Sequence, residues 1–140
     1  MLGPIVHYLN SLDAINTSNQ RIRDMVQGKA KDKLPPTGVF GWVDVRDVAL
    51  AHVRAIEVPK AGGERFFVTA GLYSNKDIAD AIKETHPELE SKLPKDTTSD
   101  MPADIYQLDN SKSIGVLGMK YRSLKESVGD AVTSMLAVGA

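Results

Sequence analysis

The sequence contains no cysteine, which excludes disulfide bonds, a thiol nucleophile and thiolate metal ligands. Its histidines, His7, His52 and His86, lie far apart and show none of the close spacings that metal sites use. No window approaches the roughly 18 apolar residues of a membrane helix, and the first residues lack the basic-then-apolar order of a signal peptide. We therefore expect a cytoplasmic protein without a metal site, a membrane partner or thiol chemistry.

Charge of one sign is not in excess either. Seventeen lysines and arginines stand against 18 aspartates and glutamates, so the formal net charge is -1. A surface without a positive surplus is a poor match for a phosphate backbone, and we expect no nucleic-acid partner. The 140 residues, 42% of them hydrophobic, are enough for one domain with an ordinary core.

The glycines do not form a phosphate-binding turn. Such a turn needs closely spaced glycines, so that the backbone can bend sharply and present its N–H groups at the start of a helix. The pairs Gly38/Gly41 and Gly115/Gly118 are followed three residues later by aspartate and tyrosine instead of a third glycine. Neither a dinucleotide fingerprint nor a P-loop is present in the sequence.

Apolar periodicity and capping residues predict four to five helices. A capping box at Ser74–Asp77, a second at Ser123–Glu126, and Asp44 as an N-cap mark three of the starts, and Gly118 marks an end. In the helix after Asp44, the spacing predicts a buried face and a solvated one. The helices are expected over 16–27, 45–56, 75–86, 110–117 and 124–136. The buried face of the second comprises Val45, Val48, Ala49, His52, Val53 and Ile56, and its solvated face Arg46, Asp47 and Arg54.

Three segments have the composition of strands. Residues 39–43 are apolar and aromatic, and 106–108 could form a short strand. In 65–69 the apolar residues Phe66, Phe67 and Val68 run consecutively, which is typical of a strand covered on both faces in a parallel sheet. The alternation of such strands with helices predicts an α/β fold with few short strands.

One pair of residues has the spacing of a catalytic site. Tyr121 and Lys125 match the Y-x-x-x-K pattern in which a lysine lowers the pKa of a tyrosine that protonates a carbonyl. That chemistry needs both side chains on one helix face. Because Ser123 is the expected N-cap, Tyr121 should fall outside the helix, and we assign no catalytic residue.

Four blocks in order carry a resemblance to a known family. They are Gly3-Pro4, Asn16-Thr17-Ser18-Asn19, the run from Trp42 to His52, and Gly63 to Phe67. In this succession they closely resemble the C-terminal portion of extended short-chain dehydrogenases/reductases, and most closely the fungal NADPH-dependent carbonyl reductases related to methylglyoxal and dihydroflavonol reductases. The resemblance extends over nearly the whole chain, through Leu117-Gly118 and the SLKE start of the last helix.

The resemblance implies one partial domain over residues 1–140, comprising the substrate lobe and the last sheet elements of a Rossmann-type reductase whose sheet is incomplete here. Such reductases transfer hydride from NADPH to a small aldehyde or ketone. The glycine-rich turn and the catalytic Ser, Tyr and Lys of the family would precede Met1. We therefore expect the chain alone to be inactive and to bind no cofactor tightly.

The resemblance also implies site residues. The first segment corresponds to the stretch that passes beside the nicotinamide, so Met1, Gly3 and Pro4 are candidates for cofactor contact. Thr17 and Ser18, with Asn16, are candidate neighbours of the cofactor or substrate. His7, Trp42 and Val43 could wall a substrate pocket. Each also has a structural reading: Gly-Pro as a turn, Thr17 as an N-cap, and Trp42 as core.

Two alternatives remain open at this point. The chain could derive from an NAD-dependent epimerase/dehydratase or a hydroxysteroid dehydrogenase, since the Trp42-to-His52 block is common among these. It could also be a non-catalytic module that docks onto a full-length relative through an exposed sheet edge. The same edge predicts self-association of the isolated chain.

Overall fold

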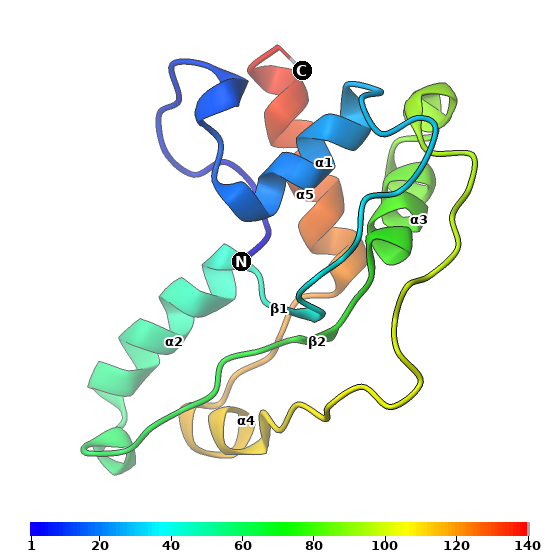
Figure 1. The fold of residues 1–140 in the computed structure, drawn as a ribbon. Helices are drawn as coiled ribbons and strands as arrows, with labels where there is room; N and C mark the ends of the chain where they lie inside the picture. Colours follow the sequence, from blue (N-terminus) through cyan, green and yellow to red (C-terminus); the bar gives the residue numbers. More distant parts are fainter. Residues whose placement is uncertain (140) are drawn as a thin grey trace.

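The computed structural model describes residues 1–139, and within that range it holds five α-helices, three 3-10 helices and one two-stranded sheet (Figure 1). The α-helices are α1 (Thr17–Val26), α2 (Val45–Glu57), α3 (Asn75–Thr85), α4 (Ser111–Leu117) and α5 (Leu124–Ala137). The 3-10 helices are η1 (Leu12–Ala14), η2 (Pro59–Ala61) and η3 (Pro87–Lys92), and the strands are β1 (Gly41–Trp42) and β2 (Gly71–Leu72). The predicted α/β class with few short strands and an incomplete sheet is confirmed.

The main core lies between α1, α3 and α5. Helix α3 packs along α5, and α1 crosses α5 on another side (Figure 1). Helices α3 and α5 approach closely because Gly129 of α5 has no side chain. A Cβ built there would lie 3.0 Å from Cγ2 of Thr85 on α3. Fully buried side chains fill the space between the helices: Ile22, Met25, Val26, Ile78, Ile82, Val128, Val132 and Met135.

Most of the predicted helix ends are where capping chemistry places them. Ser74 and Asp77 form the capping box of α3, Asp44 Oδ1 accepts the Arg46 N–H at 2.8 Å, and Ser123 Oγ accepts the Glu126 N–H at 3.2 Å. Gly118 ends α4 with φ of 66°, the left-handed region that a residue without a Cβ adopts at least cost.

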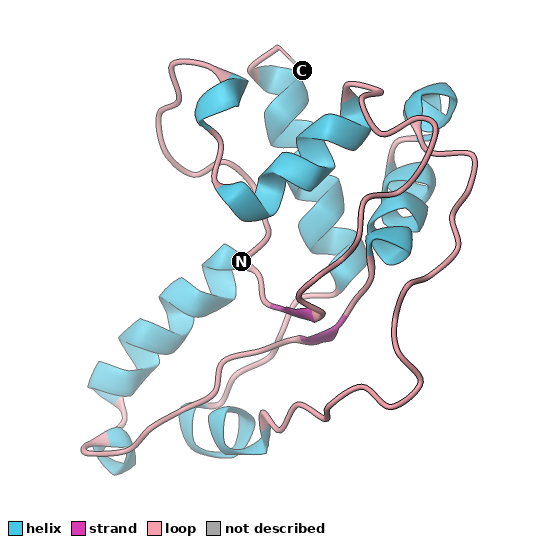
Figure 2. Cartoon of the chain, in the orientation of Figure 1, coloured by secondary structure: helices cyan, strands magenta, loops and turns pink. Residues whose placement is uncertain are grey.

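The prediction of a strand at 65–69 is wrong. This segment is extended but belongs to no strand, and the chain from Gly62 to Ala70 runs as a loop (Figure 2). Phe66 and Val68 pack on a small second cluster around Leu117 and Met119, whereas Phe67 is 54% exposed. Among the described residues, 65–69 forms no ladder with a strand, although the Thr69 hydroxyl at its end donates to the carbonyl oxygen of Trp42 in β1 at 3.1 Å.

The direction of strand pairing also differs from the prediction. Strands β1 and β2 pair antiparallel, with Gly41 opposite Leu72 and Trp42 opposite Gly71, and not parallel. The segment 39–43, expected as a short strand or an extended stretch, contains a strand of two residues, and 106–108 forms no strand. The parallel contact that exists is a single bridge between Leu2 and Asp44.

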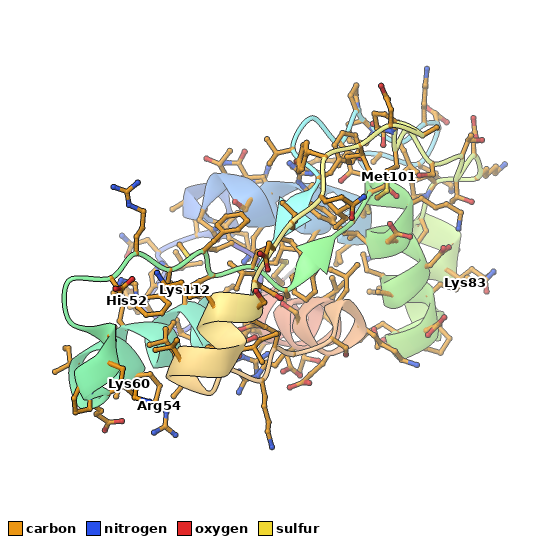
Figure 3. The ribbon with its side chains drawn as sticks, turned by 90° about the horizontal axis from the view of Figure 1, so that it is seen from below. His52, Arg54, Lys60, Lys83, Met101 and Lys112 are labelled. Atoms are coloured by element: carbon orange, nitrogen blue, oxygen red, sulfur yellow. The ribbon has the colours of Figure 1, made fainter. Side chains whose placement is uncertain are left out.

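The predicted faces of α2 are also wrong, except that Arg54 is exposed as expected. Asp47, expected in solvent, is fully buried, and its carboxylate accepts the Arg122 N–H at 2.9 Å and pairs with the Arg122 guanidinium. The predicted apolar face is largely in water instead, with Val53 49% and Ile56 88% exposed. Helix α2 projects away from the main core, and the labelled His52 lies on its surface (Figures 1 and 3).

Within residues 1–139, no helix combines the length and apolar character that crossing a membrane requires.

Candidate functional site

The first seven residues form one wall of a small hollow. The start of α1 and the first residue of α2 form the rest, and the hollow has a volume of about 210 Å³. Its lining is predominantly apolar, with asparagine and histidine as the polar side chains and no lysine or arginine among the described residues. The lining consists of Met1, Leu2, Gly3, Pro4, Ile5, Val6, His7, Ile15, Asn16, Asn19 and Val45.

Backbone hydrogen bonds hold this first segment in place. The Leu2 N–H donates to the carbonyl oxygen of Val43, and the Val45 N–H donates to that of Leu2, both at 2.9 Å. Farther along, the Ile5 N–H donates to Ser134 Oγ of α5 at 2.9 Å. The segment is therefore attached to the start of α2 at one end and to α5 at the other.

Gly3 is the point of closest approach. Its φ of 122° is rarely adopted by other residues, and a Cβ there would lie 3.1 Å from both Asp44 Oδ2 and Val45 Cγ1. A side chain at this position would have to displace the buried Asp44 carboxylate. Glycine therefore keeps the backbone close to the start of α2.

Asn19 has one side-chain polar atom, Oδ1, that makes no hydrogen bond with the first segment. It is 4% exposed, and its Nδ2 donates to the Gly3 carbonyl oxygen at 2.9 Å. Its Oδ1 is buried and has no hydrogen-bond partner among the described residues. Because an unsatisfied buried acceptor is costly, this oxygen is suited to accept a hydrogen bond from a bound donor.

Sequence reasoning did not single out Asn19. Its position carries a signal, because Asn19 lies three residues before Ile22 on the buried stripe of α1, where an apolar side chain is the norm. A polar residue within an apolar stripe needs hydrogen-bond partners, and the Gly3 carbonyl oxygen is the partner of Asn19 Nδ2.

The structure brings together some of the predicted site residues and not others. Met1, Gly3, Pro4 and His7 line the hollow, as does Asn16. Ser18 lies next to it, since its Oγ accepts a hydrogen bond from the Met1 amino group at 3.4 Å. Thr17 begins α1 beside Asn16 but is not in the lining.

Trp42 and Val43 lie apart from the hollow. They are only 7% and 8% exposed, and Trp42 belongs to the main core. Trp42 also forms β1, where its carbonyl oxygen accepts the Ala70 N–H at 2.8 Å. Within this chain, both residues have the contacts of structural side chains.

The carboxylate next to the hollow is neutralised internally. Asp44 is fully buried and accepts from Arg46 at Nε (2.9 Å) and at the terminal nitrogen (2.8 Å), and Arg46 also reaches Asp130 at 2.6 Å. Burial is the largest single influence and acts to raise the pKa of Asp44, but the hydrogen bonds from Arg46 and Ser127 and the positive charge of Arg46 together outweigh it, so the pKa lies below its usual value. Asp44 is thus held ionised and is not a free base.

The tyrosine and lysine with catalytic spacing are separated, as predicted. Tyr121 precedes α5, and its hydroxyl hydrogen-bonds Ser113 Oγ at 2.7 Å, which itself donates to the Asn110 carbonyl oxygen. Lys125 lies within α5 and pairs with Glu84 of α3 at 2.9 Å. The lysine does not act on this phenol, and both side chains are engaged in structural contacts.

The lining of the hollow suits a flat, partly polar group. Apart from His7, it contains no side chain that could serve as a general acid. Its volume is below the roughly 300–1,000 Å³ typical of whole small-molecule sites. A nicotinamide ring fits its chemistry, since the carboxamide N–H groups could donate to Asn19 Oδ1, which has no partner among the described residues. The phosphates of a dinucleotide find no glycine-rich turn within residues 1–139. The same range holds no cluster of three or more metal-ligating side chains.

Comparison with solved structures defines the class of fold. The reductase Gre2 from Candida albicans superposes with a TM-score of 0.82 at 30% identity, covering 99% of this chain and 42% of that one. Yeast methylglyoxal/isovaleraldehyde reductase Gre2 complexed with NADPH gives a TM-score of 0.82 at 31% identity, covering 97% and 40%. The chain thus has the fold of part of a Rossmann-type reductase.

The sequence is similar to those of reductases over nearly the whole chain. The chain is 54% identical over 138 residues to the ketoreductase azaE of Aspergillus niger, covering 97% of this chain and 41% of that protein. It is 32% identical to the NADPH-dependent methylglyoxal reductase GRE2 of Saccharomyces cerevisiae, covering 97% and 40%. No family model matches.

The chain is homologous to fungal NADPH-dependent reductases of the extended short-chain dehydrogenase/reductase family, which confirms the resemblance. It spans about 40% of the length of these relatives, consistent with a C-terminal portion.

Proposed function

We propose that this chain forms the substrate lobe of an NADPH-dependent carbonyl reductase and supplies one wall of the nicotinamide site. The observation that carries the proposal is the pairing of Gly3 with Asn19. Both residues line one hollow, and the buried Oδ1 of Asn19 has no partner among the described residues, in a chain that is 54% identical to a ketoreductase. NADPH would supply the hydride when bound.

The chain's own residues would bind and orient, and would not transfer a proton. Asn19 would fix the carboxamide through Oδ1 while its Nδ2 keeps the Gly3 peptide in place. Met1, Pro4, Thr17, Ser18 and His7 would flank the cofactor and a small aldehyde or ketone. We place Trp42 and Val43 behind this wall, where their packing would set its position.

The 140 residues alone should bind NADPH weakly and reduce nothing, because they offer no phosphate anchor and no acid for the carbonyl oxygen. Loss of NADPH absorbance in the presence of reactive aldehydes and ketones measures this directly. Turnover by the 140-residue chain at the rate of a full-length reductase would refute the proposal.

A chimera tests whether this chain contributes to an active reductase. The remaining length of the A. niger ketoreductase, joined to this chain, should restore NADPH oxidation. In that chimera Asn19→Leu should raise the KM for NADPH at least tenfold, since the carboxamide loses its acceptor. Asn10→Leu makes the same change at an exposed asparagine outside the lining, so it is the matched control and should leave the KM within twofold. Equal effects of the two variants would remove Asn19 from the site. The proposal also places the protein in the cytoplasm, which fractionation of the host cell would test.

A further inference from the structure

A second cavity lies away from the first segment. It has a volume of about 700 Å³, within the roughly 300–1,000 Å³ typical of small-molecule sites. Its walls come from α1, the start of α3, and the loops 27–40 and 93–110. Both loops run past α3, and Met101 marks the second loop near the upper end of α3 in Figure 3.

A network of hydrogen bonds builds one wall of this cavity. Asp100 accepts from the Thr37 N–H at 2.7 Å and from the Thr37 hydroxyl at 2.6 Å, and Thr37 Oγ1 accepts the Asn75 N–H at 2.9 Å. Asn75 Nδ2 donates to the Pro35 carbonyl oxygen at 2.8 Å, and Arg21 donates to Asn75 Oδ1 at 3.1 Å. Four segments of the chain, from α1, the loop 27–40, the start of α3 and the loop 93–110, are thereby tied together.

The cavity has an apolar floor. Ala30, Leu34, Pro35 and Pro36 line it, and Ala30 and Leu34 also pack against the main core. The two prolines restrict the backbone of the loop, so this floor costs less entropy to order than a flexible loop would. An apolar body of one or two rings would remove this surface from water.

The charges around the rim are mostly satisfied within the protein. Of the carboxylates in the lining, Asp24 pairs with Arg23 at 2.8 Å, Asp96 accepts from the Thr98 hydroxyl at 2.8 Å, and Asp100 binds Thr37. Of the cations in the lining, Lys76 pairs with Asp80. Arg21 is engaged by the carbonyl oxygen of Thr37 at 3.2 Å and by Asn75.

Two lysines differ from the rest. Lys29 and Lys33 line the cavity, and neither makes a salt bridge with any residue in 1–139. The pKa of Asp96 lies below its usual value mainly because Thr98 donates hydrogen bonds to its carboxylate, and the positive charge of Lys33 adds to this lowering. Counting Arg21, Lys29, Lys33 and Lys76 against Asp24, Asp96 and Asp100, the lining carries four positive and three negative groups, a surplus of one. A single negative charge balances that surplus, whereas a doubly charged phosphate would reverse it.

We propose that this cavity binds a small organic monoanion, a carboxylate on an apolar ring system, with the carboxylate at Lys29 and Lys33 and the rings on the floor formed by Ala30, Leu34, Pro35 and Pro36. The proposal does not depend on the proposed reductase function. A bound carboxylate would lie between the two free ammonium groups and balance the surplus of one positive charge in the lining, and its rings would bridge the loop carrying the lysines to the loop that carries Asp100.

Binding of naphthoate to the 140-residue chain, followed by backbone amide NMR shifts, tests the proposal. We expect saturable shifts in 27–40 and 93–101, and at least tenfold weaker binding of naphthamide, which has the same rings without the charge. The double variant Lys29→Gln/Lys33→Gln should lose the preference for naphthoate and keep the affinity for naphthamide.

The matched control is Lys31→Gln/Lys95→Gln. These lysines lie in the same two loops, outside the cavity lining, and the control changes the net charge by the same amount. It should bind naphthoate within twofold of the parent chain. The absence of saturable shifts, equal affinity for the two probes, or equal losses in the two double variants would each overturn the proposal.

Discussion

Replacing Asp44 by asparagine should separate two roles that this residue combines. Asp44 caps α2 through the Arg46 N–H, and its charge holds the Arg46 side chain through two further hydrogen bonds. Asparagine is about as good an N-cap as aspartate, so Asp44→Asn retains the cap and removes the charge. Asp44→Ala removes both.

The magnitude follows from burial. The Asp44 side chain is fully buried and that of Arg46 is 28% exposed, so the pair is neither a surface salt bridge nor wholly dry. Hydrogen bonds to charged groups contribute about 1.5–3 kcal/mol, and breaking a fully buried ion pair costs about 3–5 kcal/mol. Because Arg46 retains Asp130 and some water, we expect Asp44→Asn to lower the free energy of unfolding by about 2–3 kcal/mol. Loss of the cap should cost about 1 kcal/mol more in Asp44→Ala.

Urea unfolding at neutral and acidic pH measures both the size and its cause. At a urea m-value of about 1.5–2 kcal/mol/M, the Asp44→Asn midpoint should fall by about 1–2 M at pH 7. The pKa of Asp44 is lower in the folded than in the unfolded chain, so its stabilisation is present above the unfolded pKa of about 4 and is lost as the pH falls through the folded value. The gap between parent and Asp44→Asn should therefore close toward acidic pH.

Asp13→Asn is the control, because Asp13 is 88% exposed and its nearest cation is 3.8 Å away. It should leave the midpoint nearly unchanged. An Asp44→Asn midpoint equal to that of the parent at pH 7, or a gap that persists unchanged at acidic pH, would refute the reasoning about this ion pair.

Three further changes have clear expected outcomes. Gly129→Ala should destabilise by about 1–3 kcal/mol in thermal or urea unfolding, because the new Cβ meets Thr85 where α3 and α5 touch. Gly115→Ala, in α4 with no atom within 4 Å of the new Cβ, should instead stabilise by about 0.5–1 kcal/mol, and a loss there would contradict the packing argument. Self-association of the 140-residue chain should appear in size-exclusion chromatography and decrease in Val53→Lys/Ile56→Lys. A monomer peak for the parent would count against that expectation.

Local chemistry in the sequence predicted the helices well. Capping at Ser74, Ser123 and Asp44 needs only neighbouring residues, since the side chain and the N–H that it accepts lie within three positions. Gly118 follows the same logic at a C-terminus. The family resemblance was recognisable because it depends on blocks in order and not on any tertiary contact.

Strands and faces could not be predicted in the same way, because they depend on distant partners. Asp47 reads as a solvated residue of a helix start, and only Arg122, far along the chain, makes its burial favourable. The hollow illustrates the same limit. Gly3 was identified from a resemblance, but Asn19 becomes a site residue only when the fold brings its side chain to the Gly3 carbonyl oxygen.

The two largest errors share a physical cause. The outer face of α2 and the segment 65–69 both have the pattern of buried structure, yet Ile56 and Phe67 are 88% and 54% exposed. An apolar pattern indicates that a surface is suited to burial. Whether it is buried depends on the contacts that the 140 residues themselves provide. The relatives, of which this chain spans about 40%, have further polypeptide that could cover both surfaces. If the proposed function holds, the chimera with the A. niger ketoreductase should bury Ile56 and Phe67, and amide exchange in 45–57 and 65–69 should slow relative to the 140-residue chain.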